Sequence, residues 1–372
     1  MAAASASEAS PRRSPLHDRH VELGAKFAQF GGWSMPVEYT GVVKEHTAVR
    51  TSVGVFDVSH LGKAVVRGPG ATDYVNATLS ADLAKIGPGQ AQYTLCCDAE
   101  TGGVVDDLIV YLHDDERVFL VPNAANTAEV VRRLADEAPS GVSVESQHES
   151  HAILAVQGPG CDEVLSAAGL PVGHDYMSFV ETELAGTPVV VCRTGYTGER
   201  GYELVMPSDA AADVWDALSA AEVAASATPI ACGLGARDTL RTEMGYPLHG
   251  QDITPDVTPN QARLGWAVGW KKDVFWGRSA LVAEKEAGAS RVLRGLVAMG
   301  RAIPRPGMSV LADDALVGVV TSGTFSPTRK QGVGLALLDR AVTDDAEVSL
   351  DVRGRSEPFT VTKPPFVDPS VR

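Results

Sequence analysis

The sequence lacks the features that most readily assign a function. No apolar run approaches the roughly 20 residues that a helix needs to span a bilayer, so no membrane association is expected. There is no G-x-G-x-x-G or Walker-type loop either, and Gly233-Leu-Gly-Ala-Arg-Asp238 fits neither pattern. An ordinary NAD, flavin or ATP site is therefore not expected.

Cysteines are few and follow no pairing or metal-binding pattern. There are five, an odd number, scattered as Cys96, Cys97, Cys161, Cys192 and Cys232. No C-x-x-C or Cys/His spacing typical of a metal site occurs. We therefore predict reduced structural thiols in a cytoplasmic protein, and no metal.

Positive charge is in the minority. The chain has 32 Lys and Arg against 47 Asp and Glu, which gives a net charge of −15. Such a balance disfavours non-specific binding to nucleic acid or to acidic membrane surfaces, although a local basic patch remains compatible with it. Neither nucleic acid nor a membrane is an expected partner.

The length predicts more than one domain. A chain of 372 residues is too long for one ordinary core. Its 44% hydrophobic and 21% charged residues are normal for a folded soluble protein. Residues 1–15 are rich in Ala and Ser and lack the apolar centre of a secretory signal, so we predict a disordered leader there.

A weak internal repeat is present in the first two thirds of the chain. Segments 65–76 and 154–165 each read as an apolar strand, a Gly-Pro-Gly turn and an acidic helix start. Segments 118–134 and 202–218 each read as a strand that ends at proline and an amphipathic helix. Chance similarity is the alternative, but the pattern favours two related α+β lobes over residues 16–284.

The last part of the chain has a different character. It is rich in valine, glycine and turns, and four short segments (292–297, 316–321, 332–338 and 347–352) resemble strands. We predict a compact β-domain over residues 285–372.

Two glycine-rich segments carry polar side chains suited to a ligand. They are Arg193-Thr-Gly-Tyr-Thr-Gly-Glu-Arg-Gly-Tyr-Glu203 and Gly233-Leu-Gly-Ala-Arg-Asp-Thr-Leu-Arg241. Glycine lets a ligand approach the backbone closely, tyrosine offers a flat surface with a hydroxyl, and Glu and Arg add charged hydrogen-bonding groups. This equipment suits a large, polar, planar molecule.

Two adjacent carboxylates lie within an apolar strand, Val104-Val-Asp106-Asp107-Leu-Ile-Val-Tyr111. Side chains alternate along a strand, so Asp106 is expected on the face of Val104, Leu108 and Val110, and Asp107 on the face of Val105, Ile109 and Tyr111. A buried carboxylate needs hydrogen bonds or a partner, and burial raises its pKa. The alternative is a structural Asp paired with a nearby Arg or Lys.

Other polar residues have competing explanations. Asn126 is explained as the N-cap of the following helix, whereas Asn123 at the strand end has no such simple role. His60 could be a base, but no nucleophile motif surrounds it and a structural role beside Asp57 is favoured. Arg237 could hold a carboxylate or a pterin-like ring, or form an ion pair with Asp238 or Glu243.

Taken together, separated motifs resemble the glycine cleavage system T-protein family of tetrahydrofolate-dependent aminomethyltransferases. They are HVELGAKF, GGWSMPVEY, VGVFDVSH, GGVVDDLIVY, RTGYTGERGYEL, GLGARDTLR, YPLHGQD and TSGTFSPT, in the family's order from Leu16 almost to the C-terminus. The resemblance implies a three-domain cloverleaf around a folate channel, with two α+β lobes and a C-terminal β-barrel.

The resemblance also implies the reaction. An aminomethyl group on the lipoyl arm of H-protein goes to N5 of tetrahydrofolate, which gives 5,10-methylenetetrahydrofolate and releases ammonia. Asp107 would be the essential carboxylate, and we hypothesise that it orients the folate and stabilises an iminium-like transition state.

The resemblance assigns further residues to the folate site. Glu203 would bind the pterin edge and Asn123 the polar edge of the ring. The pocket would be lined and shaped by Tyr93, Tyr196, Tyr246, Arg237 and Trp266. H-protein docking should be transient and guided by charge.

Three positions depart from the family pattern. Leu61 stands where methionine is common, a change that conserves volume. Gln261 and Arg263 stand where the family usually has Glu and Gly, which makes the shape of the loop before Trp266 uncertain.

Two related functions compete with this reading. One is a demethylating one-carbon enzyme on the same scaffold, whose relatives usually carry an additional flavin domain. The other is a folate-binding accessory protein of the iron–sulfur or tRNA-modification type, whose signature contains a cysteine where this chain has Gly245-Tyr-Pro-Leu-His-Gly-Gln-Asp252.

Overall fold

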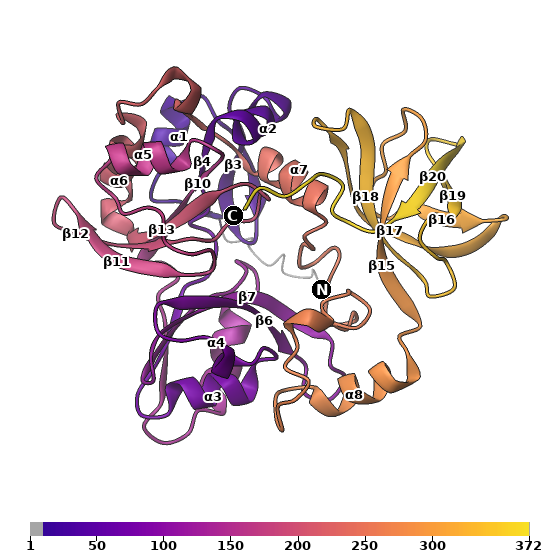
Figure 1. The fold of residues 1–372 in the computed structure, drawn as a ribbon, viewed down its shortest axis with the longest axis horizontal. Coiled ribbons are helices and arrows are strands. Elements are labelled where there is room, and N and C mark those ends of the chain that lie inside the picture. Colours follow the sequence, from indigo (N-terminus) through magenta and orange to yellow (C-terminus); the bar gives the residue numbers. More distant parts are fainter. Residues whose placement is uncertain (1–9, 372) are drawn as a thin grey trace, which may run out of the picture.

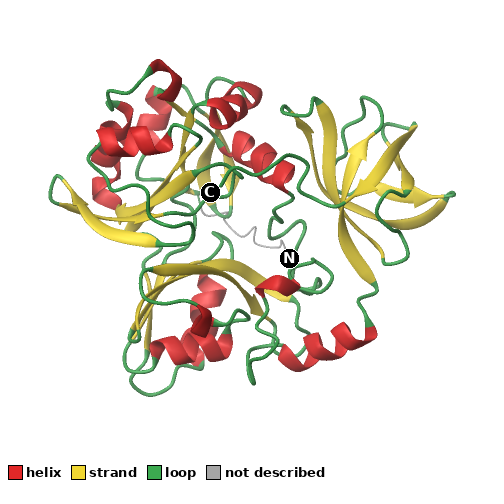
Figure 2. Cartoon of the chain, in the orientation of Figure 1, coloured by secondary structure: helices red, strands yellow, loops and turns green. Residues whose placement is uncertain are grey.

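The computed structural model describes residues 10–371, which form two α+β lobes and a β-barrel around a common centre. Figures 1 and 2 show each lobe with its sheet toward the centre and its helices on the outside. The three-part cloverleaf and its fold class agree with the prediction.

The first lobe is a five-stranded sheet covered by two helices. The sheet order is β6-β7-β8-β5-β9. Its elements are β5 (Ala64–Arg67), α3 (Ala71–Thr78), β6 (Gln90–Cys97), β7 (Val104–Asp114), β8 (Arg117–Val121), α4 (Thr127–Asp136) and β9 (Ser143–Ser146). Apolar side chains of α3 and α4 pack on alternate residues of β7 and β8 to form its core.

The second lobe is a six-stranded sheet with the order β11-β12-β13-β10-β4-β14. Its elements are β4 (Val53–Asp57), β10 (His151–Gln157), α5 (Cys161–Ala167), β11 (Phe179–Leu184), β12 (Thr187–Cys192), β13 (Gly201–Pro207), α6 (Ala211–Ser219) and β14 (Pro229–Ala231). Helices α5 and α6 cover one face, and the other face meets the sheet of the first lobe through Phe56, Tyr111 and Phe179.

The repeat predicted from the sequence is visible in the topology. In each sheet, the lobe's second, third and fourth strands in the sequence lie side by side, and its first strand lies next to the fourth. The order β6-β7-β8-β5 in the first lobe therefore corresponds to β11-β12-β13-β10 in the second. Helix α3 follows β5 as α5 follows β10, and α4 follows β8 as α6 follows β13. The lobes are therefore two versions of one arrangement.

The first lobe is inserted into the second. Strand β4 precedes the first lobe in the sequence, yet it pairs antiparallel with β10 and parallel with β14, which both follow that lobe. The two ends of the insertion meet, since the Gln147 amide donates a 2.7 Å hydrogen bond to the Lys63 carbonyl.

The N-terminal segment differs from the prediction of a disordered leader over residues 1–15. Residues 1–9 lie outside the described residues, but Arg12–Arg13 form strand β1, which pairs with β3 (Trp33–Glu38). Ser14 is buried and donates a hydrogen bond to Asp57. A buried hydroxyl with a carboxylate partner fixes this stretch, and composition alone did not reveal that contact.

The remaining N-terminal elements lie against the second lobe. They are α1 (His17–Glu22), β2 (Lys26–Phe30) and α2 (Val42–Thr51), and β2 completes a small sheet with β1 and β3. Helix α2 packs on α7 (Leu234–Met244), the helix that begins in the second glycine-rich segment.

The third unit is a closed six-stranded barrel with the order β15-β18-β17-β16-β19-β20. Its strands are β15 (Arg291–Ala298), β16 (Ser309–Ala312), β17 (Ala315–Ser326), β18 (Gln331–Asp339), β19 (Glu347–Asp351) and β20 (Ser356–Thr362). Helix α8 (Arg278–Ala287) precedes it, so the boundary proposed at residue 285 lies in the last turn of α8.

After the barrel, the chain returns to the second lobe. Figure 1 shows this C-terminal stretch crossing from the barrel toward β13. The Val371 carbonyl accepts a 2.6 Å hydrogen bond from Arg193, and the Ser370 amide donates a 2.7 Å bond to the Gly198 carbonyl. We call residues 367–371 the C-terminal strap.

No helix within residues 10–371 is both long enough and apolar enough to cross a bilayer.

Candidate active site

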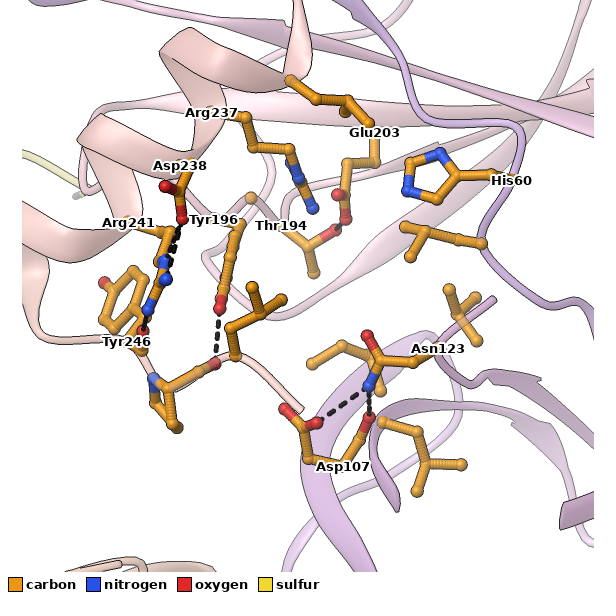
Figure 3. A pocket seen from close by; sticks show the side chains of 18 of the residues that line it. His60, Asp107, Asn123, Thr194, Tyr196, Glu203, Arg237, Asp238, Arg241 and Tyr246 are labelled. Atoms are coloured by element: carbon orange, nitrogen blue, oxygen red, sulfur yellow. Dashed lines mark hydrogen bonds and ion pairs between the residues drawn. The ribbon is translucent and has the colours of Figure 1, made fainter. Parts of the chain in front are cut away.

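One cavity of about 440 Å³ lies at the centre of the molecule, within the range of small-molecule sites. It is bounded by both lobes, by α7 and by the segment that follows α7 (Figure 3). Its lining includes every residue that the sequence predicted for the site, namely Leu61, Tyr93, Asp107, Asn123, Tyr196, Glu203, Arg237, Tyr246 and Trp266.

Asp107 lies on the cavity face of β7 and is held by two donors. The Tyr93 hydroxyl on the neighbouring strand β6 donates a 3.0 Å hydrogen bond to Oδ2. The Asn123 amide at the end of β8 donates a 2.8 Å bond to Oδ1. Burial raises the pKa of Asp107, and the bonds from Tyr93 and Asn123 oppose that rise.

Asp106 is completely buried behind Asp107. It accepts hydrogen bonds from the Asn123 backbone amide (3.0 Å), from Asn123 Nδ2 (2.9 Å) and from Asn126 Nδ2 (2.7 Å). Burial, followed by the charge of Asp107, raises the pKa of Asp106 to about 8, although these N–H donors pull it down. The two carboxyl groups share the Asn123 amide and therefore titrate as a pair.

The predicted faces of this strand are correct except at Val104 and Val105. Val104 was predicted to share the face of Leu108 and Val110 but packs with Leu95 and Cys97 in a separate core. Leu108 and Val110 point into the first-lobe core, and Asp107 and Ile109 line the cavity. Val105 was predicted to share the Asp107 face but packs with Leu108 in the core. The register shifts here, because Cys96 opposes Asp106 while Cys97 opposes Val104, and the resulting bulge reverses Val105.

Asn126 does not act as the helix cap that the sequence suggested. It occupies the N-cap position of α4, but its side chain makes no capping hydrogen bond. Its amide nitrogen instead bonds to Asp106 Oδ1 and, at 2.9 Å, to His249 Nδ1. The attraction of a buried carboxylate for N–H donors explains the difference.

Two aromatic pairs form flat walls of the cavity. Tyr196 and Tyr246 stack with ring centroids 5.6 Å apart, and the Tyr196 hydroxyl donates a hydrogen bond to the Pro247 carbonyl. Tyr93 and Trp266 stack at 5.2 Å. The Trp266 side chain is 71% exposed, which places it at the rim rather than in the interior.

Charged groups of both signs face the cavity from the second lobe and α7. The Thr194 hydroxyl donates a 2.6 Å hydrogen bond to Glu203 Oε2. The Arg237 guanidinium lies over the Tyr196 ring with Cζ 4.9 Å from its centroid. Among the described residues, buried Arg237 Nη1 has no hydrogen-bond partner. Glu203 and Arg237 thus present an acceptor and donors side by side on the wall of the cavity (Figure 3).

The ion pairs suggested as alternatives for Arg237 are not formed by it. Asp238 pairs with Arg241 at 2.7 Å, and Glu243 pairs with Arg50 at 2.8 Å. Burial lowers the pKa of Arg237, and the nearby Glu203 carboxylate opposes that change. The side chain is thus directed to the cavity instead of to a neighbour on its own helix.

His60 lines the cavity, although the sequence favoured a structural role beside Asp57. Burial, followed by the charge of Arg237, lowers the pKa of His60 to about 3, so its imidazole is neutral at neutral pH. Asp57 bonds instead to His20 Nε2 at 2.8 Å.

The loop before Trp266 accommodates both departures from the family pattern. Arg263, where the family usually has Gly, adopts a positive φ of 59°. Gln261 is largely buried, and its Oε1 accepts a 3.4 Å hydrogen bond from the Thr258 amide. Leu61 lines the cavity, as the family methionine was expected to do.

Sequence reasoning missed some residues around the cavity. Thr194 and Arg241 belong to the two glycine-rich segments and were not assigned roles, yet Thr194 holds Glu203 and both line the cavity. Helical spacing from Arg237 could have pointed to Arg241, four residues later on α7. Thr194 lies between β12 and β13 and had no such local signal. His249 and its contact with Asn126 had no comparable signal, because they join distant loops.

Within residues 10–371, no group of three or more His, Cys, Asp or Glu side chains is arranged to hold a metal ion. The five cysteines are all buried and free.

Comparisons with known proteins match nearly the whole chain to one protein family. A family model described as "GCVT N-terminal domain" matches residues 16–272, and one described as "Glycine cleavage T-protein C-terminal barrel domain" matches residues 291–368. An aminomethyltransferase of Frankia alni is 64% identical over 97% of this chain and 99% of that protein.

A further relative and a solved structure match the chain over a similar length. An aminomethyltransferase of Mycobacterium tuberculosis (strain ATCC 25618 / H37Rv) is 60% identical over 95% of this chain and 96% of its own. The crystal structure of glycine cleavage system aminomethyltransferase T from Bartonella henselae superimposes with a TM-score of 0.91 at 35% identity, covering 97% of this chain and 99% of that one.

Proposed function

This chain belongs to the glycine cleavage T-protein family and is an aminomethyltransferase of the glycine cleavage system, and we propose that its central cavity holds tetrahydrofolate with Asp107 as the catalytic carboxylate. The comparisons support this reaction over the accessory-protein and demethylating alternatives. The observation that carries the assignment of roles is the convergence of all the predicted residues on one cavity.

The residues of the cavity suit a folate ring system. The buried Arg237 Nη1 and the Glu203 carboxylate offer a donor and an acceptor for the polar edge of a pterin. Tyr196 and Tyr246 supply a flat contact surface, and the Asn123 oxygen points into the cavity (Figure 3). When bound, tetrahydrofolate supplies the nitrogen that accepts the one-carbon unit.

Asp107 contributes through charge and position. Its carboxylate is held by Tyr93 and Asn123 before any ligand arrives, so little reorganisation is needed when positive charge develops on the carbon being transferred. Because Asp107 is partly buried, water screens that attraction less than it would at the surface.

We propose that the donor is the lipoyl arm of H-protein, which docks transiently. A carrier that visits several enzymes requires a modest interface with a fast exchange. We also propose a cytoplasmic location, as the free and buried thiols predict.

The test is turnover of aminomethyl-loaded H-protein with tetrahydrofolate, measured as methylenetetrahydrofolate and ammonia. Asp107→Asn keeps the shape of the side chain and removes its charge, and kcat should fall by about 10²–10³, as for other single electrostatic groups. Folate affinity, measured by calorimetry, should be retained.

Leu61→Met provides a matched control in the same cavity. It restores the side chain common in the family at similar volume, so its kcat and folate KM should stay near those of the wild type. Full activity of Asp107→Asn would remove the catalytic role of Asp107, and failure of the wild type to use the loaded carrier would remove the proposed donor.

A further inference from the structure

His249 does not line the cavity, yet both of its ring nitrogens are engaged. Nε2 lies 3.0 Å from the Val104 carbonyl at the start of β7, and Nδ1 lies 2.9 Å from Asn126 Nδ2 at the start of α4. The residue follows α7 in the segment that also carries Tyr246 and Pro247. It therefore joins three parts of the chain that are distant in sequence.

These contacts determine the tautomer of His249. The Val104 carbonyl only accepts hydrogen bonds, so Nε2 must carry the proton. Asn126 Nδ2 only donates, so Nδ1 must be the acceptor. In this arrangement the ring accepts from Asn126 and donates to Val104, and the contact fixes which end of the Asn126 amide faces the ring.

The fixed amide continues toward the carboxylate pair. The second hydrogen of Asn126 Nδ2 is donated to Asp106 Oδ1 at 2.7 Å. Asn123 Nδ2 donates to the same oxygen at 2.9 Å and also to Asp107 Oδ1 at 2.8 Å. An unbroken series of hydrogen bonds thus runs from His249 to the carboxylate in the cavity.

We propose that His249 is a positioning residue for one-carbon transfer, which acts through Asn126, Asp106 and Asn123 to hold the Asp107 carboxylate in its reactive orientation. This inference rests on the catalytic role proposed above for Asp107.

The use of Asn126 supports a role beyond holding a loop. A side chain at a helix N-cap stabilises the helix when it caps, and Asn126 forgoes that bond. If the amide were reversed, its oxygen would face the oxygen of Asp106, and the two would repel. His249 Nδ1 and Asp106 Oδ1 both take the amide nitrogen of Asn126, so the histidine reinforces the orientation that Asp106 requires.

The first experiment compares His249→Gln with His249→Leu in the full-length enzyme. Glutamine offers an oxygen to Asn126 and an N–H to Val104, whereas leucine keeps the bulk and offers neither. For His249→Leu we expect kcat to fall about tenfold, the equivalent of one hydrogen bond, with the folate KM nearly unchanged. His249→Gln should recover most of this loss.

Asn126→Ser tests the next step of the series. Serine is an equally good N-cap, so α4 keeps its start while both amide donors are lost. Its kcat should fall as in His249→Leu, with the folate KM nearly unchanged. This variant also decides the matter if His249→Leu fails to fold.

A double-mutant cycle separates this inference from the role of Asp107 itself. In an Asp107→Asn background, His249→Leu should cause no further loss of kcat, because both changes act on one group. An equal additional loss there, or a rise in folate KM with kcat preserved, would overturn the positioning role. Wild-type kcat in Asp107→Asn alone would instead refute the catalytic assignment.

Discussion

Asp106 and Asp107 share the side-chain amide of Asn123, and the burial of Asp106 links proton binding to folding. The pKa of Asp106 is raised to about 8 by burial and by the neighbouring charge. The folded protein therefore binds a proton that the unfolded chain has released above its ordinary carboxyl pKa, about 4.

This linkage predicts a pH dependence of stability. Because the raised pKa means that the native state holds more protons, the contribution of Asp106 is full below about pH 4 and is lost as the pH rises toward 8. Asp106→Asn should remove this part of the decline. Urea unfolding of both proteins between pH 5 and 8.5 measures it, and parallel curves would contradict the assignment.

Backbone strain at Arg263 predicts a stabilising substitution. Its φ of 59° costs a residue with a Cβ about 1 kcal/mol, whereas glycine adopts it freely. Glycine also loses more freedom on folding, so we expect Arg263→Gly to stabilise the protein by a net of about 0.5 kcal/mol. Thermal unfolding reports the change.

The neighbouring residue gives the control for that measurement. Ala262 is buried and has no positive φ, so Ala262→Gly should destabilise the fold by about 1 kcal/mol. A loss of stability in both variants would show that the Arg263 side chain compensates for its strain.

At the residue scale, the sequence predicted the cavity side chains but not all of the groups that hold them. Asp107 and Glu203 lie in motifs with local signatures, and both reach the cavity. Asn126 was predicted from a local pattern to cap a helix, but in the structure its side chain bonds to Asp106 instead. Local patterns carry no information on such partners, because the contact depends on the tertiary fold.

At the scale of elements, the C-terminal strap supports the first glycine-rich segment. Its Val371 carbonyl binds Arg193 and its Ser370 amide binds the Gly198 carbonyl, on either side of Tyr196. A segment with many glycines has much freedom to lose, so external bonds matter to its order. The C-terminal strap therefore stabilises the Tyr196 wall of the cavity from outside the cavity.

Removal of residues 367–372 should weaken folate binding more than catalysis. Phe366, which packs in the core beside the barrel, is retained. With the anchors of the Tyr196 segment lost, we expect the folate KM to rise about three- to tenfold, the equivalent of one hydrogen bond or slightly less, and kcat to change little. Ser370→Ala keeps the backbone bond and should behave as wild type in steady-state kinetics.

Strand–turn–helix units were the elements best predicted from the sequence. Gly-Pro-Gly turns and proline-terminated strands mark them locally, and both repeats are present. The β7 bulge and the pairing of Arg12–Arg13 with β3 were missed, because register and distant pairing leave no local pattern.

At the scale of the whole molecule, one buried carboxylate joins three parts. Glu243 on α7 accepts hydrogen bonds from Arg50 on α2 and, at 3.0 Å, from Thr328 beside the barrel strands. It is fully buried, and its pKa is lowered to about 2 because the bonds from His46, Ser326 and Arg50 outweigh desolvation. The barrel and the lobes are thereby coupled.

Glu243→Gln should uncouple the barrel from the lobes. Removing one member of a buried ion pair typically costs about 3–5 kcal/mol, since the other charge stays buried. Calorimetry should then show two unfolding transitions in place of one, with the lower midpoint reduced. A single transition at the wild-type temperature would contradict this coupling.

The three-part architecture was predicted from the sequence, while its nesting was not. The change to a β-rich composition after Trp266 indicated the barrel, and the internal repeat indicated the two lobes. Nothing in the composition of β4 indicated that its partners would follow a whole lobe later, because hydrophobic pattern specifies burial but not pairing.

The insertion of the first lobe determines the order in which parts of the chain can fold during synthesis on the ribosome. Strand β4 leaves the exit tunnel before the first lobe, and its partner β10 appears only after that lobe is complete. The first lobe has all its strands between Ala64 and Ser146 and so closes early. Lys63 and Gln147, at the two ends of the folded first lobe, are joined by a hydrogen bond, and this brings β4 close to β10. Folding of the inserted lobe therefore promotes pairing of the strands of the second lobe.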